Sequence, residues 1–172
     1  EFAVARQQGR SARLSVEYLN WAANKVLGRA DDGSFFSDLW KGFAAHGIKF
    51  EDIDYVFCTH LHVDHVGWNT RMVDGKLKPT FPNAKYVMHR KEYAAWEAAH
   101  KRGDDPPGTV FRDNVLPVVE AGQALIVDDD YALDDTVTLT PTPGHSPCHC
   151  CVNIFSKGQR AVVTGDMMHH AL

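Results

Sequence analysis

The six residues from His60 to His65, with the sequence HLHVDH, place three imidazoles and a carboxylate close together in the chain. They follow an apolar run, residues 55–59, whose composition predicts a strand. Neutral imidazole and carboxylate are the usual ligands of zinc and similar divalent ions. In an extended chain His60 and His62 point the same way, and a following helix would turn Asp64 and His65 towards a second position. The segment predicts a metal centre at a sheet edge rather than a His-rich surface turn.

Two later segments carry groups of the same kind. His145 comes just past a predicted strand, in the Pro/Gly-framed loop 141–146, which fixes a side chain at low entropic cost. Asp166, preceded by Gly165, closes the predicted strand 160–164, which we expect to be buried. A buried carboxylate needs a partner, because leaving it unpaired is costly. Either segment alone is weak evidence, but beside the first cluster both indicate metal ligation.

Length and charge narrow the class of protein. The chain has 172 residues, enough for one domain with its own core. Its net charge of −4, without a basic block, argues against nucleic acid or an anionic membrane as the partner. No apolar run reaches the length of a membrane span. The sequence begins with Glu1 rather than Met, so a signal peptide cannot be assessed, and we favour the cytoplasm only slightly.

The pattern of apolar residues predicts an α/β fold with many short strands and helices laid over them. One helix is expected to begin at Ser34 as N-cap and to stop at Gly47. Turns are expected at residues 73–76 and 156–159. The predicted strands are 14–20, 55–59, 84–88, 123–127, 136–140, 150–155 and 160–164, and the predicted helices are 34–46, 91–101 and 109–116.

The cysteines follow no familiar framework. Cys58, Cys148, Cys150 and Cys151 have neither the spacing of a disulfide scaffold nor that of a paired C-x-x-C zinc site. Cys58 lies within an apolar strand, as a small buried residue would. The segment 148–151 could bind a soft metal, but we favour structural thiols on a strand beside the predicted centre.

Taken together, the three motifs resemble the metallo-β-lactamase superfamily. The order H-x-H-x-D-H, then P-G-H, then G-D, each after a strand, is similar to that family from about residue 35 to the C-terminus. The segments 67–69 (GWN), 80–84 (TFPNA) and 166–170 (DMMHH) resemble its branch of lactonases and methyl-parathion-type organophosphate hydrolases. The resemblance implies an αββα sandwich, a single partial domain over residues 1–172, incomplete at both termini.

The same resemblance implies a set of metal ligands. The first metal would be held by His60, His62 and His145, the second by Asp64 and His65, and Asp166 would bridge both. His149 matches a family histidine that we expect beside the ligands rather than among them, and Cys148 replaces a family glycine. The implied cofactor is Zn2+, as one or two ions, with Fe, Mn or Co as alternatives.

Two departures from the family pattern stand out. The family's last ligand is a histidine several dozen residues after the G-D motif, whereas this sequence stops at Leu172, and residues 16–24 lack the family's V-D-T-G-like turn. We therefore expect a truncated chain. His169 or His170 could replace the lost ligand, although packing beside the site is the simpler expectation. A sheet edge left unpaired would favour a homodimer.

The implied activity is hydrolysis of a lactone, ester or organophosphate by a metal-bound hydroxide, with two metals in the full-length protein. Asp64 is the expected catalytic residue, which orients the nucleophile and passes a proton to the leaving group. Trp68, Phe81 and Trp96 are candidates for an apolar wall around a small-molecule substrate, or for ordinary core. The alternatives are β-lactam hydrolysis, an iron-dependent oxidative member such as a persulfide dioxygenase, and a catalytically impaired metal-binding fragment. A serine hydrolase is not expected, because the sequence has no G-x-S-x-G elbow.

Overall fold

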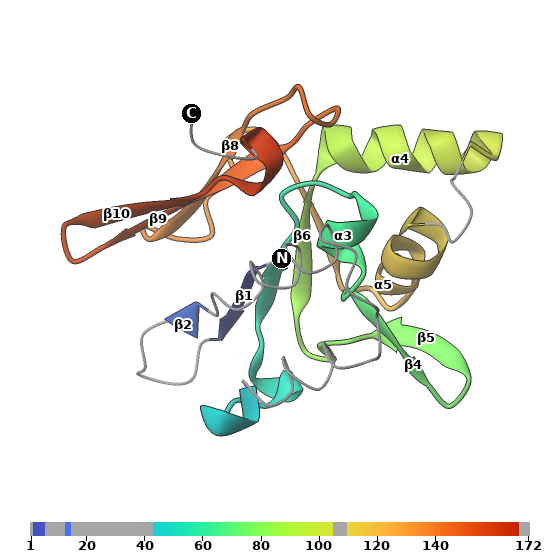
Figure 1. Ribbon diagram of the computed structural model, residues 1–172, viewed down its shortest axis with the longest axis horizontal. Coiled ribbons are helices and arrows are strands. Elements are labelled where there is room, and N and C mark those ends of the chain that lie inside the picture. The colour runs from blue at the N-terminus through green and yellow to red at the C-terminus, as the bar shows by residue number, and fades with distance from the viewer. Residues whose placement is uncertain (1, 6–12, 15–42, 105–109, 169–172) are drawn as a thin grey trace.

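The computed structural model describes residues 2–5, 13–14, 43–104 and 110–168, which form two main sheets and a hairpin (Figure 1). The larger sheet has the order β2-β1-β3-β6-β7, with β3, β6 and β7 parallel. Its strands are β1 (Phe2–Ala5), β2 (Arg13–Leu14), β3 (Tyr55–Phe57), β6 (Lys85–His89) and β7 (Ala124–Val127). The antiparallel sheet β10-β9-β8 contains β8 (Val137–Pro141), β9 (Cys150–Ser156) and β10 (Gln159–Val163), and the hairpin pairs β4 (Thr70–Val73) with β5 (Lys76–Pro79).

Alternation along the central strands produces two cores, one on each face of the larger sheet. Val56 of β3 and Tyr86 of β6 pack on one face with a large cluster that reaches the helices. Their neighbours Phe57 and Val87 point the other way, and pack against β8 and β9 through residues such as Val152. The smaller sheet therefore packs on one face of the larger sheet, and the helices cover the other face.

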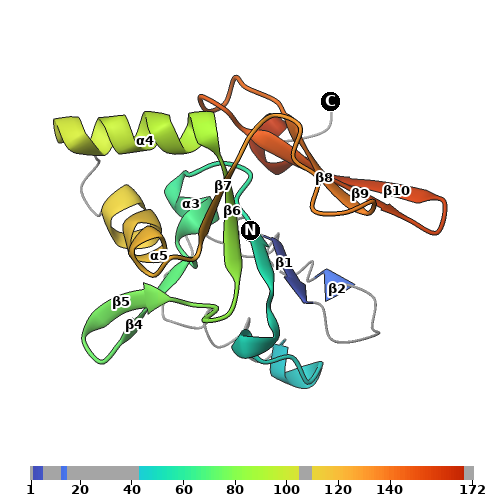
Figure 2. The ribbon, with the colours of Figure 1, turned by 180° about the vertical axis from the view of Figure 1, so that it is seen from behind.

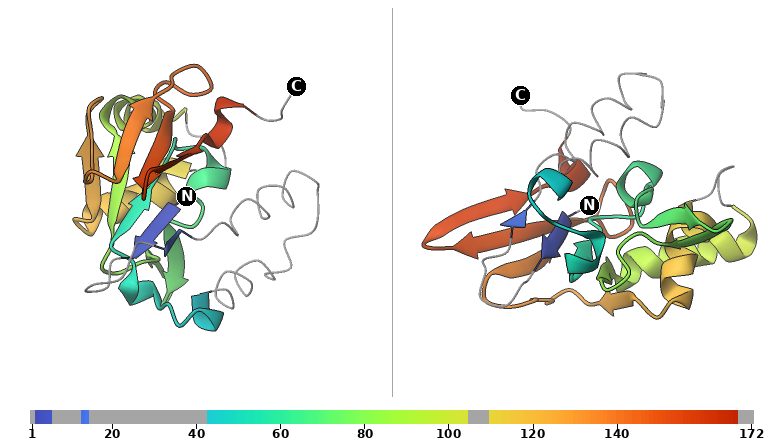
Figure 3. Two further views of the ribbon diagram at one scale, coloured as in Figure 1. Left: turned by 90° about the vertical axis from the view of Figure 1, so that its left-hand side faces the viewer. Right: turned by 90° about the horizontal axis from the view of Figure 1, so that it is seen from below.

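The helices have clear boundaries. Helix α4 (Arg90–Arg102) begins at His89, whose Nδ1 accepts a 3.2 Å hydrogen bond from the Lys91 amide, and ends at Gly103 with a φ of 75°. Helix α3 (Val63–Val66) follows directly after β3, and α5 (Leu116–Glu120) follows a π-helical turn, Phe111–Val115. Figure 2 and the right panel of Figure 3 show α4 and α5 at the opposite end of the molecule from β9 and β10.

Most expected elements in the described part are confirmed with small shifts at their ends. The strands predicted at 55–59, 84–88, 123–127, 136–140, 150–155 and 160–164, the helix at 91–101 and both turns are present. Of the strand expected at 14–20, only Leu14 is described. Of the helix expected at 34–46, residues 43–45 are helical and Gly47 has a φ of 65°, while residues 34–42 lie outside the described part.

Two expectations about these elements were wrong in detail. The helical segment predicted to end at residue 116 continues to Glu120, because Pro117 occupies a first-turn position where its missing N–H costs nothing. Strand β10 is largely exposed rather than buried. Within the described residues, β9 is its only pairing partner, so its side chains lie at the margin of the smaller sheet. No helix in the described ranges is both long and apolar enough to cross a bilayer.

Candidate metal centre

The three motifs predicted from the sequence meet in space at the carboxyl end of β3. The Cys150 amide, at the start of β9, donates a 2.8 Å hydrogen bond to the carbonyl of Thr59, which joins the His145 loop to the end of β3. Donor atoms of His60, His62 and His145 lie within 4.8 Å of one another, and so do those of His60, His65 and Asp166. Residues more than one hundred positions apart thus supply a single compact group of donors, which we call the His/Asp cluster.

Asp166 lies between the two halves of this cluster. Its Oδ2 is 3.3 Å from Nε2 of His145 and 4.0 Å from Nε2 of His60. Its Oδ1 is 3.2 Å from Nε2 of His65. One carboxylate oxygen therefore faces each half, which is the geometry a bridging ligand needs.

Asp64 is the remaining predicted ligand, and it lies beside His65. Its Oδ2 is 3.4 Å from Nε2 of His65, and its side chain is one-third exposed. A hydrogen bond from His65 lowers the pKa of the Asp64 carboxyl to about 2. Asp64 is therefore ionised at neutral pH.

Two imidazoles of the cluster, those of His60 and His62, are held in the neutral form that metals bind. Burial lowers the pKa of His60 to about 2, with further lowering by His65 and other neighbouring imidazoles. Burial and the neighbouring His145 lower the pKa of His62 as well. A metal would therefore meet lone pairs rather than ring protons that it must displace.

An unpartnered nitrogen shows that the residues present fit a metal ion. His60 is fully buried, and its Nδ1 lies 3.1 Å from the Thr59 hydroxyl, but its Nε2 has no hydrogen-bond partner among the residues that the structure describes. Leaving such a group unsatisfied is costly, and a metal is a natural partner. His62 Nδ1 and His145 Nε2 also lie 2.9 Å apart, with their ring nitrogens converging. This donor set suits zinc and related divalent ions.

A buried carboxylate that the sequence analysis missed ties the two histidine loops to α4. Glu92 is 1% exposed and accepts hydrogen bonds from the Leu61 amide at 3.1 Å and the Cys148 amide at 2.8 Å. The Ser146 hydroxyl and the indole of Trp96 donate to it as well, at 2.9 and 2.8 Å. Glu92 therefore fixes the backbone on both sides of the centre. The signal was weak because an acidic residue in the first turn of a helix is common.

His149 fixes the third segment, as its expected place beside the ligands suggests. Its Nε2 accepts a 3.0 Å hydrogen bond from the Asp166 amide, so the ring proton lies on Nδ1 and is donated to the Thr142 hydroxyl at 2.7 Å. Gly165, with a φ of 50°, passes so close that an added Cβ would lie 2.5 Å from His149 Nε2. Only glycine allows this approach.

The aromatic residues considered for a substrate wall all contact the helix-side core, and one of them also reaches the centre. Trp68 and Phe81 are each 3% exposed and belong to the helix-side core, so they do not line the centre. Trp68 lies between α3 and β4, and Phe81 follows β5. Trp96, for which core was the favoured interpretation, is partly buried and packs against that core, and its ring also lies 5.5 Å from that of His62.

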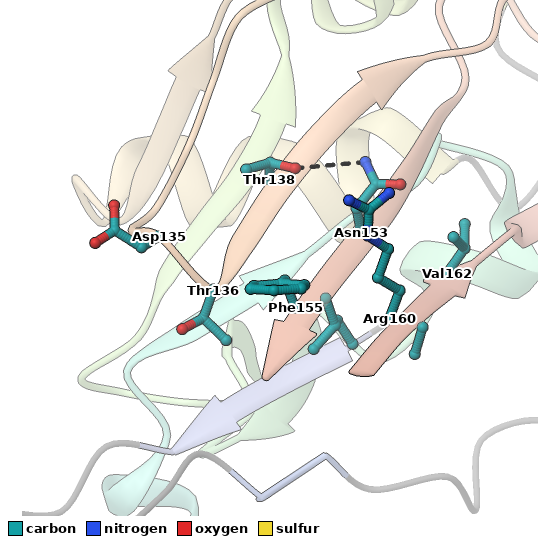
Figure 4. A pocket seen from close by; sticks show the side chains of 9 residues that line it. Asp135, Thr136, Thr138, Asn153, Phe155, Arg160 and Val162 are labelled. Atoms are coloured by element: carbon teal, nitrogen blue, oxygen red, sulfur yellow. Dashed lines mark hydrogen bonds between the residues drawn. The ribbon is translucent and has the colours of Figure 1, made fainter. Parts of the chain in front are cut away.

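A separate groove lies on the smaller sheet and is lined by residues of β8, β9 and β10 (Figure 4). It has a volume of about 380 Å3 and is lined by residues that include Thr138, Asn153, Phe155 and Arg160. None of its lining residues belongs to the His/Asp cluster, so it provides no substrate cavity for that cluster.

Comparisons with known proteins identify the class that this fold and cluster define. The family model described as "Metallo-beta-lactamase superfamily" matches residues 28–171, and the chain belongs to that superfamily. Its mixed α/β fold is the expected one. The solved structure of hydrolase AbOPH, of the beta lactamase superfamily, superposes with a TM-score of 0.63 at 25% identity, covering 75% of this chain and 46% of that one.

Among curated relatives, N-acyl homoserine lactonases are similar to this chain. The Bacillus cereus lactonase is 34% identical over 103 residues, and the Bacillus thuringiensis lactonase is 31% identical over 117 residues. These matches cover 60% and 68% of this chain, but only 33% and 39% of the relatives. A B. thuringiensis AiiA structure with N-decanoyl-L-homoserine bound at the active site has a TM-score of 0.53 at 26% identity, covering 72% of this chain and 42% of that one. The expected lactonase branch is thus the one represented.

Proposed function

We propose that the protein is a metal-dependent hydrolase that opens lactones, with N-acyl homoserine lactones as the substrate class and zinc as the metal. The observation that carries the proposal is Asp166, which directs one oxygen to His145 and the other to His65. The similarity to lactonases supports the substrate class. A related N-acyl homoserine lactone hydrolase, 26% identical, has been solved with its product N-hexanoyl-L-homoserine at a catalytic metal center.

The proposed ligands are those expected from the sequence: His60, His62, Asp64, His65, His145 and Asp166. Zinc-type ions bound there would lower the pKa of a coordinated water from about 15.7 to roughly 7 and polarise the carbonyl that is attacked. Asp64, ionised and partly exposed, accepts a hydrogen bond from the attacking oxygen and orients it. As the C–O bond of the lactone ring breaks, Asp64 would take the proton of the attacking oxygen and pass it to the leaving alkoxide.

The chain's other residues keep this arrangement rigid. Glu92 and His149 hold the backbone of the ligand segments, so the donors need little rearrangement when a metal enters. Trp96 presents an aromatic edge beside His62, where the acyl chain of a lactone could pack.

Metal content, measured by elemental analysis of protein loaded with zinc and then desalted, tests the ligand set. We expect Asp166→Ala to bind at least one equivalent less zinc than the unaltered chain, because it removes the carboxylate shared by both halves. The matched control Asp135→Ala changes an exposed aspartate of the groove and should retain full zinc content. Equal zinc content in both variants would refute the proposed ligand set.

Substrate class is tested with a panel made of an N-acyl homoserine lactone, an aryl ester, a phosphotriester and a β-lactam. We expect the zinc-loaded protein to prefer the lactone, and Asp64→Ala to reduce that rate about 100-fold or more, as loss of a positioned acid–base group does. A preference for the β-lactam, or oxidation of a persulfide with iron but no hydrolysis with zinc, would replace the proposal with that alternative.

A further inference from the structure

A second cluster of side chains that could hold a metal ion shares no residue with the His/Asp cluster. His89, Cys148 and Cys150 place their donor atoms within 4.8 Å of one another, and all three are buried, at 2%, 2% and 0% exposure. His89 ends β6, Cys148 lies in the His145 loop, and Cys150 begins β9. We call these three residues the thiol cluster.

We propose that the thiol cluster binds a thiophilic d10 cation of the zinc or copper(I) class. Two thiolates and an imidazole are soft donors that select such ions over magnesium, calcium or manganese. A divalent ion with two thiolates is also electrically neutral, which suits a site removed from water. The sequence alone favoured structural thiols at 148–151. His89 changes that interpretation, because it adds a third ligand from a distant segment.

The cluster is already held in place by hydrogen bonds outside it. The Cys148 amide donates to Glu92 at 2.8 Å, and the Cys150 amide donates to the Thr59 carbonyl at 2.8 Å. Both thiols therefore project from fixed backbone. Binding to such a site costs little ordering of the chain.

His89 has the outer partner that metal-binding histidines use. Its Nδ1 accepts the Lys91 N–H, so the proton of the neutral ring lies on Nε2 and is donated to Asp129 Oδ1 at 2.9 Å. A carboxylate on one ring nitrogen fixes the tautomer and strengthens the other nitrogen as a ligand. Nδ1 thus carries the lone pair, and a bound ion displaces the 3.2 Å bond from Lys91.

An entering ion must also displace the thiol protons. Burial raises the pKa of Cys150 to about 12 and raises that of Cys148 as well, so both are thiols when no metal is bound. Uptake therefore releases protons and strengthens as pH rises. The loop residues Gly144, His145 and Pro147 are exposed, so buried Cys148 lies next to the surface along the chain.

Cadmium titration separates this cluster from the His/Asp cluster. Thiolate-to-cadmium charge transfer produces an ultraviolet band, and the His/Asp cluster contains no sulfur ligand. With the full chain we expect a band that saturates at one equivalent of Cd2+, and that is lost in Cys148→Ser and in Cys150→Ser. Cys151→Ser is the matched control, since that buried thiol faces Thr142 and Met167 instead, and it should keep the band.

Variants at two exposed aspartates test the cluster without substituting its buried cysteines, so a lost band can be distinguished from a protein that fails to fold. Asp129→Ala removes the partner of His89 and should weaken Cd2+ binding about 10- to 100-fold. Asp128→Ala removes the carboxylate that pairs with Arg90 and keeps the bond between His89 and Asp129, so it should leave Cd2+ binding unchanged. Displacement of Cd2+ by Zn2+, or only by Cu+ under ascorbate, assigns the ion within the proposed class. Absence of the band, or its survival in both serine variants, would overturn the proposal. The band should persist in Asp166→Ala, so failure of the lactonase proposal leaves this one standing.

Discussion

The loop from Pro143 to Cys151 has two sides. They differ in solvent exposure and in whether sequence motifs or the structure revealed their role. On one side His145 is exposed and meets His62 and Asp166, within the motifs that the sequence displays. On the other side Cys148 and Cys150 are buried and meet Glu92 and His89. The open side carries the donors for a substrate-facing metal, while the closed side fixes the loop. Chemistry on the open side therefore depends on packing and hydrogen bonds on the closed side.

Glu92 is where we expect the closed side to be most sensitive. Glu92→Ala leaves four donors, three of them buried, without their acceptor, at about 1–3 kcal/mol for each unsatisfied group, so we expect a loss of at least about 4 kcal/mol. Denaturant unfolding measures this loss. Glu92→Gln, which keeps one acceptor oxygen, should fold and show weaker zinc binding.

Glu97→Ala is the matched control on the same helix. Glu97 pairs with Lys101 and Tyr93 near the surface, and we expect little change in unfolding or zinc binding. If Glu97→Ala were as damaging as Glu92→Ala, the effect would belong to the helix as a whole, and the contrast between open and closed sides would fail.

The open side could be predicted from the sequence because its metal-donor residues are clustered in short motifs. Residues 60–65 carry four of the six predicted ligands, and a strand followed by a helix aims them in known directions. Glu92 gave no such signal. Three of its four partners lie 31, 54 and 56 residues away, in segments whose proximity depends on the parallel pairing of β3 with β6 and on the hydrogen bond between β9 and Thr59. Contacts of that kind are created by tertiary structure rather than by local pattern.

The same reason explains the aromatic residues. The sequence could not separate core positions from centre positions among the three aromatic residues. Each is near a motif or on a helix: Trp68, Phe81 and Trp96. Only the packing of α3, the hairpin and α4 determines that Trp68 and Phe81 enter the core and Trp96 meets His62. The exposure of β10 was missed for a similar reason, because an apolar strand at the margin of a sheet has the same sequence pattern as a strand in its middle.

Trp68→Ala measures how much the core beneath the His60–His65 segment contributes to the free energy of unfolding. Removing this buried indole should cost about 3–5 kcal/mol, because it leaves a cavity in the helix-side core. Zinc binding by the protein that remains folded should be unchanged, since Trp68 does not line the centre. Thermal unfolding and zinc titration together separate the two effects.

Phe155→Ala, at a half-exposed aromatic of β9, provides the comparison for Trp68 and should change stability by about 0.5 kcal/mol or less. An altered zinc affinity in Trp68→Ala without loss of stability would return this residue to the substrate wall and would weaken the division between core and centre.

The smallest effect should come from a single methyl group at Gly165, where the open and closed sides meet. Alanine there would place its Cβ 2.5 Å from His149 Nε2 and 2.9 Å from the Thr59 hydroxyl, next to the amide of Asp166. Gly158 also has a positive φ, of 74°, but an added Cβ there would meet no atom of the described part of the chain within 4 Å. Both alanine variants share the backbone strain of the left-handed region, so the difference between them isolates the steric contact. We expect Gly165→Ala to be less stable than Gly158→Ala by about 1–3 kcal/mol, the usual cost of overpacking, and to bind zinc more weakly because Asp166 is displaced. Equal stability and equal zinc binding would show that Asp166 does not depend on its support by His149.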